Sequence, residues 1–297
     1  MSIEKNFERT LVTSALPYAN GHIHLGHIAG AYLPADIYVR YKRLRGERVL
    51  YVGGSDEYGV PITLTALKEG ITPREVVDRY HAANAAAFEK LGISYDIYGR
   101  TSWDLHVDTT QAFFTKLHAG GYIHQEEVEL WFSPQLERFL PDRYVLGTCP
   151  KCGYEDANGD ECESCGAQYA AHDLVRPRAN IPGDTSSPVL RKSKHWFLDL
   201  PKFAGPLKDW LDTHPEWRSN VRGIAYGWVG DLRPRCITRD TDWGVPIPLD
   251  DPDASGKRIY VWFDAPIGYV TNTRQWGIDA GLGEDAWQRW WKDPATR

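Results

Sequence analysis

The sequence predicts an α/β protein with a doubly wound, Rossmann-like parallel sheet, interrupted by an insertion that carries a zinc knuckle. Three observations lead to this expectation. Signals for strands and helices alternate over residues 1–117, the alternation breaks down over 118–232, and two Cys-x-x-Cys pairs lie where it breaks down. Because strand–helix–strand units close with right-handed crossovers, the alternation favours parallel strands.

The first section, residues 1–117, is expected to form the first half of a nucleotide-binding domain. An apolar, β-branched run predicts a strand over 9–14, and apolar residues at helical spacing predict a helix over 25–45. Pro34 lies inside that helix and should bend it, because proline has no N–H to donate. A short apolar run at 49–52 predicts a buried strand.

A second helix in this section has a clear start signal. A Gly-rich turn at 53–59 follows the buried strand. Thr72 precedes Pro73, and Glu75 lies three residues after the threonine, which is the pattern of a capping box with proline at the first helical position. We expect this helix to reach Leu91, which completes the order strand, helix, strand, helix.

The middle section, residues 118–232, is expected to be a connective insertion between the two halves of the sheet, with the zinc knuckle at about 146–168. Residues of turn type predict a loop at 180–188. A β-rich aromatic run predicts a strand at 195–200, and a helical stretch follows near 203–212.

The last section, residues 233–297, is expected to be a truncated second half of the nucleotide-binding domain. Its aromatic and β-branched run at 258–263 predicts a buried strand. The end of the chain is rich in tryptophan. We expect Trp287, Trp290 and Trp291 to expose apolar surface there.

The composition favours a soluble intracellular enzyme. Hydrophobic residues make up 42% and charged residues 25% of the chain, close to the average for globular proteins. No apolar run is long enough to cross a bilayer and the N-terminus is no secretory signal, so we expect a cytoplasmic protein without a membrane partner. The net charge of −6 gives no support for nucleic-acid binding by the whole chain. The basic cluster between 40 and 48 is equally well explained as a solvated helix end.

Four of the five cysteines suit a single metal ion. Cys149 and Cys152 form one Cys-x-x-Cys pair, and Cys162 and Cys165 form the other, with nine residues between the pairs. Zinc accepts four thiolates tetrahedrally, so we expect one structural zinc ion. Two redox pairs or two disulfides are the alternatives, which the sequence context and the lack of a secretory signal disfavour. Cys236 is most simply a small buried hydrophobe.

Residues 16–27 read Leu-Pro-Tyr-Ala-Asn-Gly-His-Ile-His-Leu-Gly-His and lie at a predicted strand-to-helix turn. Backbone N–H groups are unpaired at a helix start and the helix dipole is positive there, so this turn suits a phosphate. His24 and His27 are three residues apart and face the same side of the first turn. Gly26 has no Cβ, so a flat ring can approach its backbone. Taken alone, the two histidines also fit a surface pair or part of a metal site.

Asp56 follows the strand predicted at 49–52, at the sheet edge where open parallel sheets bind ligands. A carboxylate there can hold an ammonium group by a charge-assisted hydrogen bond. The alternative is that Asp56 caps the following helix. The residues alone do not decide between these two roles.

Two segments together resemble one enzyme family. The stretch 16–27 resembles the His-Ile-Gly-His signature of class I aminoacyl-tRNA synthetases, and Ala-Leu-Pro-Tyr-Ala-Asn-Gly at 15–21 is similar to methionyl-tRNA synthetases in particular. Val-Trp-Phe-Asp-Ala-Pro-Ile-Gly-Tyr at 261–269 resembles a second segment of that family. An ordinary aromatic core is the alternative for this second segment, because the chain contains 12 Trp, but the order and spacing favour the family.

The resemblance implies a binding site for methionine. In the family, an aspartate in the context of Asp56 contacts the amino group of methionine, and the backbone of Leu16 and the ring of Tyr18 would meet the sulfur. An unbranched thioether suits an aromatic-lined slot, because sulfur contacts rings favourably. The residues implied to bind methionine are Leu16, Tyr18, Asp56, Trp262, Ala265, Pro266 and Tyr269.

The resemblance also implies a two-step reaction, in which methionine and ATP form methionyl-adenylate and the methionyl group then passes to tRNA. Catalysis would consist of positioning and of charge stabilisation at the phosphates, with Mg²⁺ accompanying ATP. Both histidines of the turn would donate to the phosphates, and the glycine would lie under adenine. The residues implied to bind ATP are Asn20, His24, Gly26 and His27. Arg239 resembles a family arginine near the site, and a salt bridge to Asp240 or Asp242 explains it equally well.

The sequence departs from the family in the segments it lacks. The Lys-Met-Ser-Lys-Ser signature, the Phe-Ile-Gly-Lys-Asp segment and the helical anticodon-binding domain are absent from the 297 residues, whose single Met is residue 1. We therefore expect a truncated catalytic fragment, inactive or feeble by itself, whose full-length form binds tRNA. The alternative is a non-catalytic fragment that keeps nucleotide or RNA binding.

Overall fold

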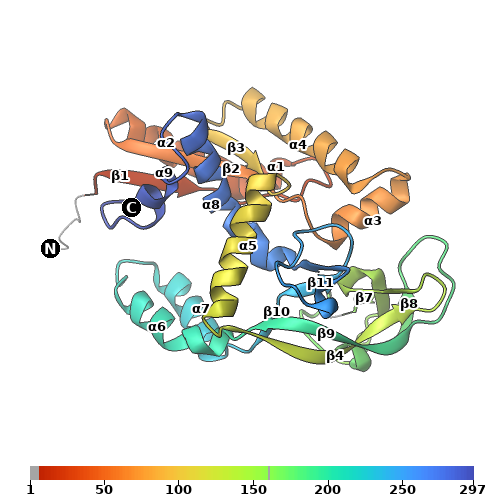
Figure 1. Cartoon of the computed structure of the whole chain (residues 1–297). Helices are drawn as coiled ribbons and strands as arrows, with labels where there is room; N and C mark the ends of the chain where they lie inside the picture. Colours follow the sequence, from red (N-terminus) through yellow and green to blue (C-terminus); the bar gives the residue numbers. More distant parts are fainter. Residues whose placement is uncertain (1–6, 160) are drawn as a thin grey trace.

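The structure, a computed structural model, describes residues 7–159 and 161–297 and combines a parallel sheet with antiparallel sheets (Figure 1). The parallel sheet and its helices occupy the upper part of the view, and a long antiparallel ribbon runs along the lower edge. Helix α5 (Asp104–Ala119) runs between these two regions. The arrangement confirms the predicted α/β class with a parallel sheet. In the described part of the chain, no helix combines the length and the apolar character that crossing a membrane requires.

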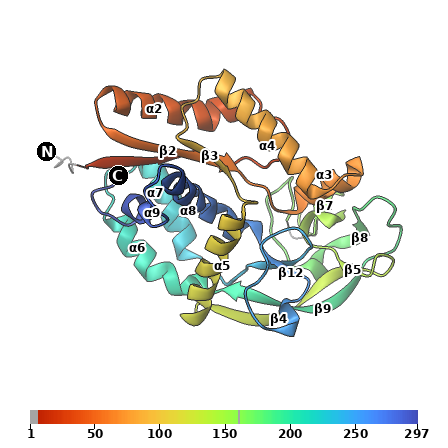
Figure 2. The ribbon, with the colours of Figure 1, turned by 45° about the horizontal axis from the view of Figure 1, so that its top comes forward.

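The parallel sheet holds three strands within the described residues. They lie in the order β1 (Arg9–Thr13), β2 (Arg48–Ser55) and β3 (Ile97–Arg100), and both pairs are parallel. Helices cover both faces of the sheet, as a doubly wound fold requires (Figure 2). The helices of one face are α2 (Leu33–Leu44) and α4 (Pro73–Lys90), and those of the other are α8 (Val261–Asp279) and α9 (Ala286–Trp291).

The helix predicted at 25–45 is present, but it contains a π-helical turn before Pro34. It consists of α1 (Leu25–His27), a π-helical turn η1 (Ile28–Tyr32) and α2. The N–H of Leu33 donates to the carbonyl of Ile28, five residues back, and Pro34 occupies the first turn of α2. A proline is tolerated at that position because its missing N–H would have no helical partner.

The capping box predicted for the second helix is confirmed in α4. The Thr72 hydroxyl accepts from the Glu75 N–H at 3.2 Å, and the Glu75 carboxylate accepts from the Thr72 N–H at 2.8 Å. Helix α3 (Val60–Glu69), together with β3 and α5, was not predicted. In α3 the buried residues lie on most sides of the helix, so the sequence has no apolar stripe of helical period.

The antiparallel region is built on two long paired strands. Strand β4 (Ile123–Ser133) pairs with β9 (Val189–Leu198) from Ile123↔Leu198 to Phe132↔Val189, and the second half of β9 confirms the strand predicted at 195–200. The short strands β5 (Arg138–Phe139) and β10 (Arg235–Cys236) complete the sheet in the order β10-β9-β4-β5. This ribbon carries the cysteine-bearing lobe at one end and a helical pair at the other.

The cysteine-bearing lobe is a small sheet in the order β7-β6-β8. Its elements are η2 (Asp142–Tyr144), β6 (Val145–Thr148), β7 (Ala157–Asn158), η3 (Ala171–Asp173) and β8 (Val175–Ala179). Val145 and Leu174 of this lobe share an apolar cluster with Val60 and Leu64 of α3. The helical pair is α6 (Ala204–Asp212) and α7 (Ser219–Gly230), preceded by the 3-10 turn η4 (Leu200–Phe203), and α6 confirms the helix predicted near 203–212.

The strand predicted at 258–263 is wrong beyond Ile259. The structure has β11 (Thr238–Asp240), η5 (Pro252–Ala254) and β12 (Lys257–Ile259), and helix α8 begins at Val261 after an extended Tyr260. A short apolar run fits a buried strand and a buried helix equally well, so the pattern could not separate them. The longest element of the last section is therefore a helix, α8.

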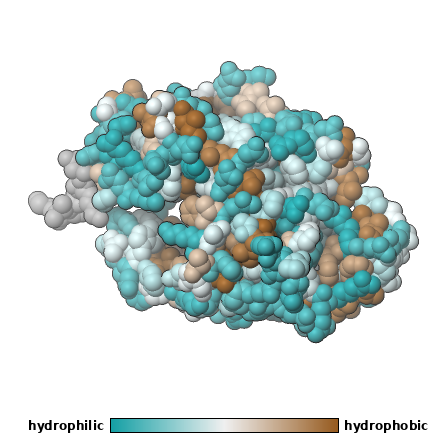
Figure 3. Space-filling model, viewed as in Figure 1, coloured by the Kyte–Doolittle hydropathy of each residue, from teal (hydrophilic) through white to brown (hydrophobic). Residues whose placement is uncertain are grey.

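Of the three tryptophans expected to expose apolar surface, Trp291 is exposed, Trp287 is half-buried and Trp290 is buried. Trp290 in α9 is 4% exposed and packs against Leu50 and Val52 of β2, which corrects the expectation for this residue. Trp291 is 37% exposed, and its Nε1 donates to the Thr273 hydroxyl at 3.0 Å. On the face shown in Figure 3, apolar residues form small separate patches among hydrophilic ones.

Candidate active site and metal centre

The histidine turn lies between β1 and α2, as predicted, and its two rings are stacked. The ring centroids of His24 and His27 are 3.8 Å apart with an interplanar angle of 22°. His24 caps α1, because its Nδ1 accepts from the Gly26 N–H at 3.1 Å, and Nδ1 of His27 accepts from the His24 N–H at 3.3 Å. All three residues are exposed, so the turn is open to a ligand.

Gly26 allows the ring of His24 to lie close to the backbone. A Cβ at residue 26 would lie 2.9 Å from Cε1 of His24, so any larger residue there would require the His24 ring to shift. The preceding turn contains Asn20. A side chain of helix α4 holds this turn in place by a hydrogen bond. The Asn84 side chain, which is fully buried, accepts from the Ile23 N–H at 3.2 Å. Asn84 was not predicted, because one polar residue inside a helix pattern gives no sign of its partner.

Asp56 lies beside Tyr18 at the carboxyl end of β2. The two residues form a parallel bridge, in which the Ala19 N–H donates to the Asp56 carbonyl at 2.8 Å and the Asp56 N–H donates to the Pro17 carbonyl at 2.9 Å. The alternative role of helix cap is wrong, because Gly59 is the N-cap of α3 and no side chain caps that helix. The Asp56 side chain therefore does not cap α3.

Burial raises the pKa of Asp56 well above its ordinary value, and a negative charge on Asp264 would raise it further. The Asp56 side chain is 5% exposed, and its Oδ1 accepts one backbone N–H, from Tyr58 at 3.3 Å. Both causes act against the ionised form, because a buried carboxylate without a cation loses its hydration. A ligand that brings a positive charge would relieve this cost.

Leu16, Tyr18 and Tyr269 approach the same place from two ends of the chain. A Cβ at Gly268 would lie 2.9 Å from Cδ1 of Leu16, so α8 passes directly behind the 16–18 segment. Burial, and in part the charge of Asp56, raise the pKa of Tyr269. Ala265 and Tyr18 pack against one apolar cluster, which contains Tyr58, Val261 and Ile259. The structure thus brings together the predicted residues Leu16, Tyr18, Asp56, Ala265 and Tyr269.

Trp262 lies in the first turn of α8 and faces outward. Its side chain is 67% exposed and lines a cleft of about 1010 Å³, together with Trp228 of α7 and Tyr260. Pro266 is also exposed. The prediction placed Trp262 on a buried strand as the wall of a slot, and the early start of α8 explains why the side chain points elsewhere.

A buried ion pair next to Asp56 was missed by the sequence analysis. Glu57 is fully buried, and its carboxylate accepts from Nε of Arg100 at 2.8 and 2.9 Å and from the Ser55 hydroxyl at 2.7 Å. The indole N–H of Trp243 donates to the Glu57 carbonyl at 2.6 Å. This network ties the ends of β2 and β3 to the last section of the chain, and so fixes the backbone that carries Asp56.

Arg239 and Cys236 lie on β11 and β10, where a separate polar cluster surrounds His195. The Arg239 guanidinium stacks over the Tyr260 ring at 3.8 Å, and its Nη1 donates to the Thr238 carbonyl at 2.9 Å. Asp240 accepts from Nε2 of His195 at 2.9 Å and also pairs with Lys257. Cys236 is only partly exposed, in keeping with its interpretation as a packing residue.

The four predicted cysteines converge, and the two knuckles have the same backbone geometry. All four Sγ atoms lie within 4.8 Å of one another. The N–H of Gly153 donates to the Cys149 carbonyl at 3.1 Å, and that of Gly166 donates to the Cys162 carbonyl at 2.8 Å. Both glycines have positive φ, of +78° and +69°, a left-handed conformation that favours glycine. Each knuckle therefore turns its pair of thiols toward the other pair.

This donor set fits a zinc ion. The Sγ distances are 3.9 Å between Cys149 and Cys165 and 3.6 Å between Cys152 and Cys162. Tetrahedral Zn–S bonds of ordinary length separate the sulfurs by about 3.8 Å. Cys149 and Cys162 are buried at 3% and 1% exposure, and the other two cysteines are exposed. A closed set of four thiolates leaves no open position for a substrate.

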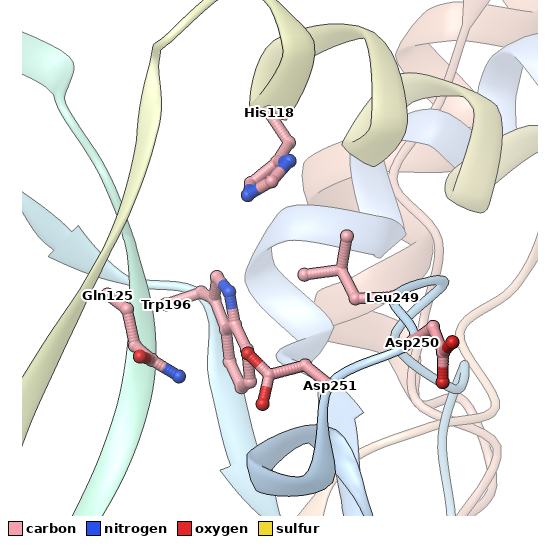
Figure 4. A pocket seen from close by; sticks show the side chains of 6 residues that line it. All are labelled: His118, Gln125, Trp196, Leu249, Asp250 and Asp251. Carbon is pink, nitrogen blue, oxygen red and sulfur yellow. The ribbon is translucent and has the colours of Figure 1, made fainter.

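A smaller cavity of about 350 Å³ lies between α5, the β4–β9 ribbon and the loop before η5 (Figure 4). Its side chains include a histidine, an indole and two carboxylates. The lining residues are His118, Gln125, Trp196, Leu249, Asp250 and Asp251. None of the predicted site residues lines it, so it is separate from the candidate site.

Comparisons with known proteins decide the family. The family described as tRNA synthetases class I (M) matches residues 10–297. The chain belongs to the class I (M) tRNA synthetases. It is 53% identical over 298 residues to the methionine–tRNA ligase of Rubrobacter xylanophilus, which covers 100% of this chain and 51% of that protein. It is 52% identical over 293 residues to the methionine–tRNA ligase of Chlorobium luteolum, which covers 98% of this chain and 41% of that protein.

Solved structures show the same class I fold. A Mycobacterium tuberculosis methionyl-tRNA synthetase bound by methionyl-adenylate matches with a TM-score of 0.69 at 23% identity, covering 96% of this chain and 50% of that chain. The ternary complex of an Agrobacterium radiobacter leucyl-tRNA synthetase matches with a TM-score of 0.52 at 22% identity, covering 76% of this chain and 25% of that chain. At these identities the likeness concerns the fold. This class I (M) chain spans about half the length, or less, of the relatives it matches.

Proposed function

We propose that this chain is the catalytic part of a methionine–tRNA ligase, which activates methionine with ATP and passes the methionyl group to tRNA. The observation that carries the proposal is an identity of 50–53% to proteins of that name over at least 98% of the chain. The placement of Tyr18, Asp56 and the histidine turn supports it, because ligands of open parallel sheets bind at the carboxyl ends of the strands. This function places the protein in the cytoplasm.

Methionine binding is assigned to the residues around Asp56. The Asp56 carboxylate would hold the ammonium group, since it is buried and has no cation of its own among the described residues. The thioether would lie against the aromatic side chains that approach Asp56. The residues of this slot are Leu16, Tyr18, Ala265 and Tyr269. Pro266 and Trp262 join them on the family resemblance alone, because Pro266 is exposed and the Trp262 side chain faces the cleft beside α7.

ATP binding is assigned to the exposed histidine turn. His24 and His27 would donate to the phosphates, and Asn20 lies in the turn before them. The His24 ring lies next to Gly26 and accepts from its N–H. This ring would have to move away before adenine could lie against Gly26. Mg²⁺ would enter with ATP as part of the substrate and offset phosphate charge. The protein's own contribution is positioning and charge stabilisation.

A structural zinc ion is assigned to the four cysteines. It would supply folding free energy to the lobe rather than chemistry, since all four ligand positions are taken by protein thiolates. We also propose that the chain is organised as two catalytic halves, 1–117 and 233–297, around an insertion at 118–232. The nearest ends of regular elements are Ala119 of α5 and Arg235 of β10.

Calorimetric titration with methionine tests the assignment. Asp56→Ala should abolish binding, because loss of the partner of a buried ammonium costs on the order of 2–5 kcal/mol. Asp279→Ala, at an exposed position where the side chain accepts from Gln275, is the control and should bind normally. Binding of ATP without any binding of methionine would contradict the proposal and favour a non-catalytic nucleotide- or RNA-binding fragment.

A further inference from the structure

A fully buried acid–histidine pair lies behind the Asp56 site. Nε2 of His106 in α5 is 3.1 Å from Oδ2 of Asp264 in α8, and both side chains are 0% exposed. A Cβ at Gly268 would lie 4.0 Å from Cε1 of His106 and 2.9 Å from Cδ1 of Leu16. The pair therefore lies next to the segment that carries Leu16 and Tyr18, on the side away from solvent.

The hydrogen bonds around His106 determine which ring nitrogen carries the proton. The Thr271 hydroxyl donates to the Ile267 carbonyl at 3.2 Å, so its oxygen accepts from Nδ1 of His106 at 3.0 Å. Burial lowers the pKa of His106 to about 3, so the ring is neutral and carries one proton. That proton is on Nδ1, and Nε2 presents a lone pair. The Thr110 hydroxyl oxygen also lies near Nε2, at 3.3 Å, farther away than Oδ2 of Asp264 at 3.1 Å.

Asp264 must then supply the proton of its own contact with His106. Two lone pairs facing each other at 3.1 Å would repel, whereas an Asp264 carboxylic acid donates its O–H to Nε2. The other oxygen, Oδ1, is buried and has no hydrogen-bond partner among the described residues. A charged oxygen in that position would be far more costly than a neutral one. Burial raises the pKa of Asp264 well above its ordinary value, in agreement with this geometry.

The neighbouring charged groups make the state of Asp264 important for Asp56. Tyr18, Tyr58, Asp56 and Glu57 face this region from the loops after β1 and β2. The charge of Glu57 is neutralised by Arg100. No lysine or arginine in the described part of the chain forms an ion pair with Asp56 or Asp264. An ionised Asp264 would therefore oppose the ionisation of Asp56, as two close carboxylates do.

We propose that Asp264 and His106 are a positioning pair: His106 keeps Asp264 as a neutral acid, and this leaves Asp56 as the carboxylate that ionises to hold the amino group of the substrate. Neither member needs to touch the substrate. The part that concerns the amino group rests on the proposed function. The protonation state of the pair does not, and can be measured in the ligand-free protein.

Nitrogen NMR of the histidine side chains tests the pair without any ligand. We expect the His106 ring to stay neutral from about pH 5 to about pH 9, with a proton on Nδ1 and none on Nε2. A protonated Nε2 would overturn the proposal, because Asp264 would then be the acceptor and ionised. This measurement uses the wild-type chain, so it does not depend on whether a variant folds.

The pH dependence of methionine affinity tests the effect on Asp56. His106→Asn keeps a donor toward Thr271 and removes the acceptor for Asp264, so Asp264 loses its proton more readily. In His106→Asn, we expect the rise of methionine affinity with pH to occur at a higher pH than in wild type. The affinity at neutral pH should be at least threefold lower. Asp264→Asn is neutral at every pH, and its amide can donate to His106. We expect it to bind within about threefold of wild type, and the double variant to regain the wild-type profile.

A matched control separates this effect from general destabilisation. His195 is also fully buried between a threonine and an aspartate, Thr238 at 2.9 Å and Asp240 at 2.9 Å. His195→Asn should leave the pH profile of methionine binding in place. A tenfold loss of affinity in folded Asp264→Asn, or a double variant that stays shifted, would overturn the proposal. Wild-type affinity in Asp56→Ala would contradict the proposed function instead, while the NMR result would still decide the state of the pair.

Discussion

Two adjacent carboxylates at the end of β2 have opposite surroundings. The Glu57 carboxylate is held by Arg100 and two serine hydroxyls, whereas Asp56 accepts one long hydrogen bond from a backbone N–H. Neighbouring residues of an extended chain point to opposite sides, so one carboxylate enters the core and the other faces the site. The place of Asp56 after a strand marked it as a candidate site residue, but no local signal indicated the role of Glu57.

Asp56→Asn should change how stability depends on pH. Because burial raises the pKa of Asp56, the folded state keeps a proton that the unfolded state releases above about pH 4. Wild-type stability therefore falls as pH rises from there through the raised pKa of the folded state. The variant lacks this contribution, so its free energy of unfolding should fall less between about pH 5 and about pH 8. Urea unfolding across this range measures the difference. If the free energy of unfolding depended on pH equally in both proteins, the account of Asp56 would be contradicted.

Glu57→Gln should destabilise the fold through Arg100. The variant leaves a guanidinium that is 18% exposed without its main partner, and breaking a buried pair in this way costs about 3 kcal/mol. Asp78→Asn is the control, because Asp78 binds the same arginine from a half-exposed position and should cost under about 1 kcal/mol. Urea unfolding measures the loss of free energy of unfolding in each variant. Equal losses would show that the burial of Glu57 does not determine the strength of its ion pair with Arg100.

At the scale of elements, the cysteine lobe shows what a sequence can and cannot predict. The Cys-x-x-Cys spacing predicted that four thiolates share one metal ion, and the converging thiols agree with this. The packing of the lobe against α3 through Tyr144, whose hydroxyl donates to Thr63, had no local signal. The lobe and the site region are therefore coupled through α3.

Metal removal should show this coupling. We expect one zinc ion per chain by elemental analysis, and loss of protection from hydrogen exchange in the lobe when a chelator removes it, since the folding free energy of a knuckle is largely metal binding. The loss should extend to α3 and stop before β1, β2 and β3. Two zinc ions per chain, or unfolding of the parallel sheet together with the lobe, would contradict this view.

The capping box of α4 and the strands at 9–14 and 49–52 were predictable because their signals are local. The start of α8 was not, because the apolar run at 258–263 fits either element, and the error placed Trp262 on a buried strand. Pattern analysis is weakest for short apolar runs, where tertiary contacts decide the conformation.

At the scale of the molecule, the candidate site is assembled from segments far apart in the chain. Tyr18 and Asp56 come from loops after β1 and β2, and Tyr269 comes from α8 in the last section. The contact between His106 and Asp264 joins residues 158 positions apart. The motif residues could be identified one by one. The pair of His106 and Asp264 had no signal in the sequence, because only folding brings the two residues together.

The 297-residue polypeptide should form methionyl-adenylate at a rate near background. Its sequence contains no Lys-Met-Ser-Lys-Ser segment, and loss of even one preorganised stabilising donor costs roughly 10²–10³ in rate. Methionine-dependent exchange of pyrophosphate into ATP measures this step. Exchange as fast as that of a complete methionine–tRNA ligase would show that the residues described here suffice for catalysis.

The most direct test of the central claim is binding of a stable methionyl-adenylate analogue, because it engages the assigned methionine and ATP residues together. Calorimetry should show one site per chain. The leucyl counterpart should bind at least tenfold more weakly, because its branched side chain does not fit a slot for an unbranched thioether. The affinity for the methionyl analogue should fall at least tenfold in Asp56→Ala. Equal binding of the two analogues, or no binding of either, would contradict the assignment of this chain as the catalytic part of a methionine–tRNA ligase.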